Sequence, residues 1–164
     1  MTALRAPRRR QLLVAALLSA AMGAARAAPA VEAETALPRP ASLPQAAQTA
    51  AAQGDALVLL VSMARCPYCE QVRRSYLLPM AAQGAAVFQI DIGSHRSLVD
   101  FDGTTRSHDA VTRARQARFA PTVLFLDPQG REIAERLIGA GLADFYGGLL
   151  EQRLQTARAR LTAR

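Results

Sequence analysis

The strongest constraint on the fold is a continuous apolar run that is followed closely by two cysteines, two residues apart. Residues 57–61 are all leucine or valine, which predicts a strand over 56–63 that is buried on both faces. The motif Cys66-Pro67-Tyr68-Cys69 comes next, and proline is favoured in the first turn of a helix. We therefore expect a central strand to lead into a helix here, with Cys66 at the N-cap and Cys69 one turn further on the same face.

This position makes the two thiols suited to disulfide exchange. The first N–H groups of a helix lack partners within it and the helix dipole is positive there, so a thiolate at Cys66 is stabilised relative to a free cysteine, whose pKa is roughly 8.5. Arg65 adds a cation beside it. We expect Cys66 to be the catalytic nucleophile and Cys69 the buried, catalytic resolving cysteine, with a redox-active disulfide between them. Pro67 and Tyr68 are expected on the surface that faces the substrate.

A structural disulfide and a metal site are the alternatives for this cysteine pair. A chain of this length buries roughly two thirds of its unfolded surface and does not need a disulfide for stability. A metal site would need two further ligands, but the only histidines, His95 and His108, lie in or beside a polar stretch where a solvated histidine or a helix-start residue is expected. We therefore expect no metal and no cofactor, since the cysteine pair itself carries the electrons.

The first residues are typical of an export signal. Four arginines within residues 5–10 precede an apolar stretch that is too short to span a bilayer comfortably, and Ala25-Arg26-Ala27 matches a small-x-small cleavage site. We expect a signal peptide over residues 1–27 and a periplasmic protein with no stable membrane insertion after cleavage. An uncleaved anchor is the alternative, and Arg9-Arg10 leaves the choice between general and twin-arginine export open.

The net charge does not indicate a nucleic-acid partner. The chain has a formal net charge of +7, but five of its 20 basic residues lie in the expected signal peptide. The remaining 15 nearly balance the 13 acidic residues and form no basic run, so we expect no nucleic-acid binding. After the signal peptide we expect a flexible leader rich in alanine and proline over 28–42, one domain over 43–158 and a C-terminal tail over 159–164.

The rest of the domain alternates between helices and strands. A polar insertion over 93–107 is expected to form a small hairpin or an ordered loop. Pro79 should kink or end the helix in which it lies. The expected helices are 43–53, 69–82, 108–118 and 142–158, and the further expected strands are 85–92, 123–126 and 131–138. The last helix is amphipathic and is expected to turn four apolar side chains inward, namely Phe145, Leu149, Leu150 and Leu154.

This order of elements resembles the thioredoxin fold over about residues 43–158. The resemblance rests on the cysteine motif after the first buried strand, on Pro121 before the next hairpin, and on Gly139 after that hairpin's second strand. It implies an α/β fold with a central mixed β-sheet flanked by helices, and it places the polar insertion before the helix that precedes a cis-proline. In that family the proline equivalent to Pro121 faces the cysteine pair, and the residue before it, here Ala120, pairs with the substrate chain. The resemblance thus implies that Ala120 and Pro121 bind substrate.

Within this family, the chain looks most like exported bacterial thioredoxin-like proteins. The implied function is a periplasmic thiol–disulfide oxidoreductase, a reductase rather than an oxidant, that acts as a monomer. Its partners would be protein disulfide clients and a thiol redox donor, for which a membrane reductant is one candidate. A non-catalytic thioredoxin-fold binding module or metal chaperone that uses the same cysteines is the alternative.

One position departs from the family pattern. Thioredoxins and many relatives carry a buried acid six residues before the first cysteine, where it helps to take the proton from the resolving thiol; here that residue is Leu60. The proton of Cys69 would then pass to water, to Glu70 or to the leaving thiolate of the partner. We expect the mixed disulfide to be resolved more slowly than an acid at this position would permit.

Overall fold

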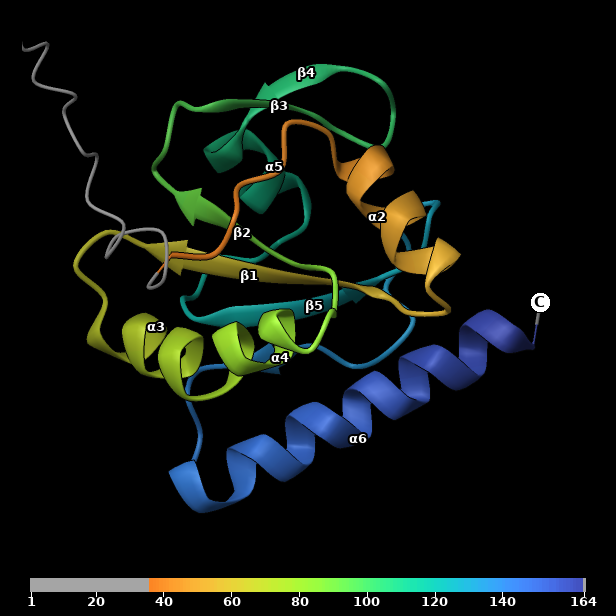
Figure 1. Ribbon diagram of the computed structural model, residues 1–164. Coiled ribbons are helices and arrows are strands. Elements are labelled where there is room, and N and C mark those ends of the chain that lie inside the picture. The colour runs from red at the N-terminus through yellow and green to blue at the C-terminus, as the bar shows by residue number, and fades with distance from the viewer. Residues whose placement is uncertain (1–35, 164) are drawn as a thin grey trace, which may run out of the picture.

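The structure is a computed structural model that describes residues 36–163 (Figure 1). The expected signal peptide and most of the expected leader lie outside these residues. Within them, a four-stranded sheet has the strand order β2-β1-β5-β6. Its strands are β1 (Leu57–Met63), β2 (Val87–Ile92), β5 (Thr122–Leu126) and β6 (Leu137–Ile138).

The sheet is mixed, as predicted. β1 runs parallel to β2, with Val61 opposite Ile90, and antiparallel to β5, with Val61 opposite Thr122. β5 in turn pairs antiparallel with the short β6. A central strand with neighbours on both sides and helices on both faces requires apolar residues at successive positions, which explains the continuous run in β1.

Helices cover both faces of the sheet and divide the core in two (Figure 1). Alternate residues of β1 enter different clusters: Leu57, Leu59 and Val61 pack with α2 (Leu43–Ala52) and α5 (His108–Ala114). Val58 and Leu60 pack on the other face, with side chains of the cysteine-bearing helix and of α6 (Ala143–Thr162). The period-two alternation of a strand therefore decides which helix layer each side chain meets.

The cysteine-bearing helix continues past Pro79. It consists of α3 (Pro67–Val72), a π-helical turn η1 (Arg73–Leu77) and α4 (Leu78–Ala82). Pro79 therefore interrupts the helix without ending it. A proline ring crowds the carbonyl of the preceding turn and has no N–H to donate, and the wider π turn accommodates both effects.

The polar insertion folds into the expected hairpin. Its strands, β3 (Ser97–Val99) and β4 (Thr105–Ser107), pair antiparallel. Ser107 then caps α5, because its Oγ accepts a hydrogen bond from the N–H of Ala110 at 3.1 Å. A serine N-cap satisfies one of the unpaired N–H groups at a helix start, as the sequence predicts.

The packed part of the chain extends beyond both ends of the expected domain. Leu37 is only 2% exposed, and the N–H of Gln89 in β2 donates to the carbonyl of Pro38 at 2.9 Å. This segment therefore covers the outer edge of β2, although it belongs to the stretch expected to be a flexible leader. At the other end, α6 continues to Thr162, so most of the expected C-terminal tail is helical.

The inward face of α6 differs from the predicted one. Leu150 and Leu154 are buried as expected, but Phe145 and Leu149 are 67% and 40% exposed. Tyr146 takes the inward position instead and lies against Tyr76, with ring centroids 5.0 Å apart. Within residues 36–163, no helix is both long enough and apolar enough to cross a membrane.

Candidate active site

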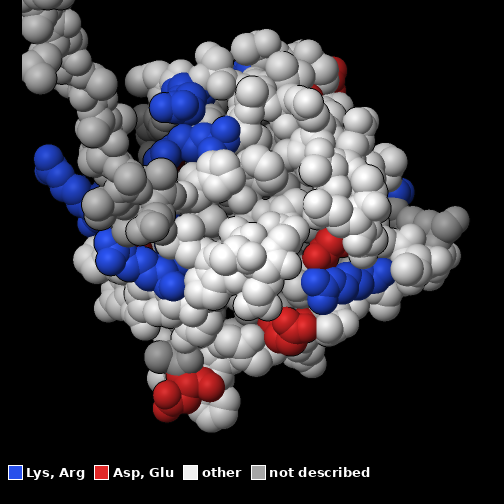
Figure 2. All heavy atoms as spheres, viewed as in Figure 1, with Lys and Arg blue, Asp and Glu red and all other residues white. Residues whose placement is uncertain are grey.

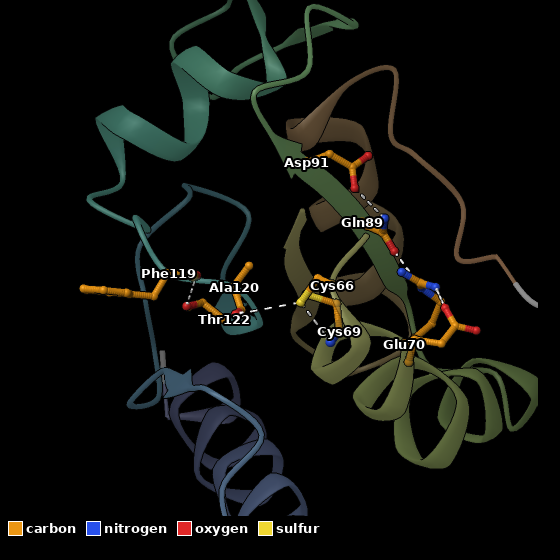
Figure 3. Close-up of a disulfide and its surroundings, with 9 residues drawn as sticks. Cys66, Cys69, Glu70, Gln89, Asp91, Phe119, Ala120 and Thr122 are labelled. Carbon is orange, nitrogen blue, oxygen red and sulfur yellow. Dashed lines mark hydrogen bonds and ion pairs between the residues drawn. A yellow bond between two sulfur atoms is a disulfide. The ribbon is translucent and has the colours of Figure 1, made fainter. Parts of the chain in front are cut away.

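The two cysteines form a disulfide at the start of α3 (Figure 3). Cys66 is the N-cap residue and Pro67 opens the helix. The N–H of Cys69 donates a hydrogen bond to the Cys66 sulfur at 3.1 Å. The predicted cap geometry is therefore confirmed, and an N–H group at the positive end of the helix already points at the Cys66 sulfur.

The two cysteine residues differ in their exposure to solvent. Cys69 is fully buried, whereas Cys66 is only half-buried. Tyr68, between them, is 64% exposed, and Pro67 is exposed as well. Of the pair, only Cys66 can therefore be reached by a disulfide of another molecule without a change in structure.

Ala120 and Pro121 lie beside this disulfide, although they are far from it in the sequence. Their peptide bond is cis, as the resemblance implied, and the Ala120 carbonyl oxygen is 3.9 Å from the Cys66 sulfur (Figure 3). The Thr122 hydroxyl donates to the Phe119 carbonyl at 2.8 Å and ties the two ends of this short loop together. The fold thus brings together all the site residues that the sequence predicts.

Arg65 precedes the nucleophile in an unusual backbone conformation. Its φ is +57°, a left-handed value that residues with a side chain adopt at a cost of about 1–2 kcal/mol. Strain of this kind persists only where the surrounding structure imposes it, and it gathers at functional sites. Sequence reasoning had no signal for it, since arginine has no preference for this conformation.

The site contains no carboxyl group at the position of the family's buried acid. Leu60 is fully buried in the same apolar cluster as Val72 and Leu77. Glu70 follows Cys69 directly, but its carboxylate forms ion pairs with Arg73 and Arg74. The hydrogen bond from Arg74 is the main cause that lowers the pKa of Glu70, so this carboxylate is a poor proton acceptor.

A cavity of about 450 Å³, lined mostly by polar and charged residues, opens beside Cys66. Two of its lining residues, Gln89 and Asp91, lie on the side of Cys66 away from Ala120 (Figure 3). A chain of side chains crosses the cavity: Arg73 Nε donates to Gln89 Oε1 at 3.0 Å, and Gln89 Nε2 donates to Asp91 Oδ1 at 2.6 Å (Figure 3). Arg39 Nε closes the chain with a bond of 2.8 Å to Asp91. Sequence reasoning missed this cavity, because its walls come from segments that are distant along the chain.

Neither histidine lines the cavity beside Cys66. His95 is exposed, and His108 is fully buried with its Nδ1 accepting the N–H of Asp91 at 3.3 Å. Burial is the main cause that lowers the pKa of His108, so its ring is neutral at physiological pH. Residues 36–163 hold no cluster of three or more histidine, cysteine, aspartate or glutamate side chains suited to a metal ion.

Comparison with known proteins gives one family match. The model of the thioredoxin-like domain family matches residues 43–153. No curated protein matches the sequence significantly.

Several solved structures are similar to this chain. A poplar wild-type thioredoxin h is 17% identical, with 66% of this chain and 85% of that one covered and a TM-score of 0.45. The oxidised C-terminal domain of Neisseria meningitidis DsbD is 23% identical, with coverage of 66% and 91% and a TM-score of 0.45. A DsbH oxidoreductase is 12% identical, with coverage of 75% and 88% and a TM-score of 0.49.

The family match spans well over half of the chain, from α2 into α6, and includes the cysteine pair and the cis-proline. The mixed sheet with helices on both faces agrees with it. The cysteine pair forms a disulfide at the start of the helix that follows the central strand, where the helix N-terminus stabilises a thiolate. The chain therefore belongs to the thioredoxin-like family and is a thiol–disulfide oxidoreductase.

Proposed function

We propose that the protein is a periplasmic thiol–disulfide reductase in which Cys66 attacks and Cys69 resolves. The observation that carries the assignment of roles is the unequal burial of the two cysteines, with Cys66 half-buried at the helix N-cap and Cys69 fully buried. The attacking sulfur must meet a second molecule. The resolving sulfur has only to meet its neighbour.

The reaction has two exchange steps. In the first, the Cys66 thiolate attacks one sulfur of the client disulfide, a Cys66–client bond forms, and the other client sulfur leaves as a thiolate that takes up a proton. In the second, the Cys69 thiolate attacks the Cys66 sulfur, and the second client sulfur leaves. The client gains two electrons, and the protein is left with the intramolecular disulfide seen in the structure.

The backbone on the other side of Cys66 provides a place for the client chain. An extended client segment would pair with the backbone of Ala120 beside Pro121, within reach of the sulfur 3.9 Å away. Tyr68 and Phe119, which are 64% and 69% exposed, offer apolar contact near this edge. Backbone pairing is independent of side chains, so it suits an enzyme that acts on several proteins.

Trapping the mixed disulfide tests the assignment of the two cysteines. The Cys69→Ser variant should accumulate client adducts on Cys66 in extracts, and these should disappear on reduction. The double variant Cys66→Ser/Cys69→Ser is the matched control and should form none. If the Cys69→Ser variant also forms none, the chain is a binding module that does not exchange disulfides.

Location and direction have separate tests. The arginine-rich, apolar N-terminal segment supports export, so the mature protein should be recovered from the periplasm with Ala28 as its first residue. The resemblance to disulfide-reducing members of the family supports the reducing direction. A reduction potential near that of thioredoxin, about −270 mV, would agree with it, and one near about −120 mV would make the protein an oxidant.

A further inference from the structure

The cavity beside Cys66 has features of a binding site. Its volume of about 450 Å³ falls within the range of small-molecule sites. Ser62, at the end of β1, lines it; this serine is 1% exposed, and within residues 36–163 its hydroxyl has no hydrogen-bond partner. A buried hydroxyl without a partner costs free energy, so one at the wall of an open cavity indicates a group that arrives with the ligand.

In the cavity, the acid and amide oxygens already accept hydrogen bonds, whereas some donors have no partner in the part of the chain that the structure describes. Each carboxylate oxygen of Glu70 and Asp91 already accepts a bond from an arginine or an amide, and so does the Gln89 carbonyl. Among the described residues, Arg39 bonds only through its Nε, so its two Nη groups remain available. The buried Ser62 hydroxyl has no partner among these residues either. The donors without partners favour a ligand that carries hydrogen-bond acceptors.

The charges in the cavity point to an anion. Three arginines and two acids line it, and Arg65 is the arginine for which the described residues provide no acidic partner. Figure 2 shows arginine side chains at the end of the molecule where β2 ends and α3 begins, whereas most acidic side chains of that face lie beside α6. Among protein side chains and the groups of small disulfides built from amino acids, the acceptor-only group with a negative charge is a carboxylate.

We propose that this cavity binds a carboxylate of the disulfide substrate, with Ser62 and Arg65 as its ligands. The inference rests on the proposed function, since Cys66 forms part of the cavity wall. A carboxylate held there would place the attached disulfide over the Cys66 sulfur. It could belong to a low-mass disulfide or to an aspartate or glutamate next to a client cysteine.

Three small disulfides of similar size test the proposal. They are the dianion 3,3'-dithiodipropionate, the neutral bis(2-hydroxyethyl) disulfide and the cation cystamine. The rate constant for reduction of each by the reduced protein is divided by its rate with dithiothreitol, which removes intrinsic reactivity. At 0.15 M salt, distant charges are largely screened. We expect the dianion to react fastest and cystamine slowest.

Matched variants assign this preference to the cavity. Ser62→Ala and Arg65→Gln should each lower the ratio of the dianion rate to the neutral rate about fivefold, the effect of one partly exposed charged contact. A change in the reactivity of Cys66 itself affects both rates and cancels in this ratio. Arg118→Gln removes an exposed arginine outside the cavity and should change nothing. Equal preferences in all four proteins would overturn the proposal, as would an equal loss in Arg118→Gln.

Two further arms separate the possible outcomes. Disulfide-linked peptides with glutamate or glutamine next to the cysteine show where the carboxylate comes from. If the preference for glutamate over glutamine is larger than the preference for the dianion over the neutral small disulfide, the substrate is a protein client. If it is smaller, the substrate is a low-mass disulfide. Propionate added to the oxidised protein should shift the NMR amide signals of Arg65 and Cys66, and should not do so in Arg65→Gln. If no disulfide is reduced but propionate binds, the proposed function fails and the anion site stands.

Discussion

Leu60→Asp places a carboxyl group at the position where relatives carry their buried acid. Leu60 is fully buried, at 0% solvent exposure, and packs within the apolar cluster on its face of the sheet. Burial there should raise the pKa of the introduced carboxyl by about 3 above its usual value near 4, which brings it close to neutral pH. A base poised there can take the proton of Cys69, and general-base catalysis contributes about 10²-fold or more.

Leu60→Asn is the matched control, because it has the same shape and a polar group but cannot take a proton. Both variants lose a buried leucine, at a cost of about 2–5 kcal/mol in the free energy of unfolding. In stopped-flow measurements of mixed-disulfide resolution, Leu60→Asp should be at least about tenfold faster than wild type and Leu60→Asn should match wild type. Equal rates for the two variants would refute the view that a missing base limits this step.

The same two variants should differ in how their free energy of unfolding depends on pH. A carboxyl whose pKa is raised by folding binds more protons in the folded state than in the unfolded state, so stability falls as pH rises between the two pKa values. The free energy of unfolding of Leu60→Asp should therefore fall by up to about 1.4 kcal/mol per pH unit between about pH 4 and 7, relative to Leu60→Asn. If the free energy of unfolding changes with pH in the same way in both variants, the introduced carboxyl group is in contact with water.

Three other measurements test the structure directly. In the reduced protein, iodoacetamide should alkylate half-buried Cys66 at least about tenfold faster than fully buried Cys69, as peptide mass spectrometry can show. Leu150→Ala should cost about 2–5 kcal/mol in denaturant unfolding and its neighbour Leu149→Ala less than about 1 kcal/mol, and similar costs would place α6 in another orientation. Glu70→Gln should be less stable than wild type at neutral pH by at most about 1 kcal/mol, since this carboxylate is partly exposed. Because folding lowers the pKa of Glu70, that difference is present above the unfolded pKa near 4 and should disappear as pH falls through the lowered value; a constant difference would contradict the ion pairs.

The parts of the fold that the sequence predicts are those decided by neighbouring residues. Each of these features depends on only a few consecutive residues. The continuous apolar run predicts β1, the proline after Cys66 predicts the Cys66 N-cap, and the serine before α5 predicts the Ser107 cap. The cis bond at Pro121 is different. It came only from the family resemblance, because no local pattern distinguishes a cis from a trans X–Pro bond.

The orientation of α6 shows where periodicity fails. Leu149 and Leu150 are adjacent apolar residues, so the apolar spacing allows either of two neighbouring faces of the helix to point inward. Which face is buried depends on the side chains opposite, and the ring of Tyr146 packs against Tyr76 from another helix. Contacts between distant segments likewise place Leu37 and Arg39 on the domain, although their alanine- and proline-rich surroundings are typical of a linker.

The anion cavity and the backbone of Ala120 lie on opposite sides of Cys66, and this arrangement makes a prediction about client sequence (Figure 3). A client chain that pairs with Ala120 crosses the Cys66 sulfur in one direction, so only residues on one side of its cysteine can reach Arg65 and Ser62. Peptides with a single glutamate before or after the reactive cysteine should therefore differ in rate by about fivefold, and Arg65→Gln should remove the difference. If both placements accelerate the reaction equally, attraction to the overall charge of the site is sufficient, because a general field does not distinguish the two sides of a cysteine.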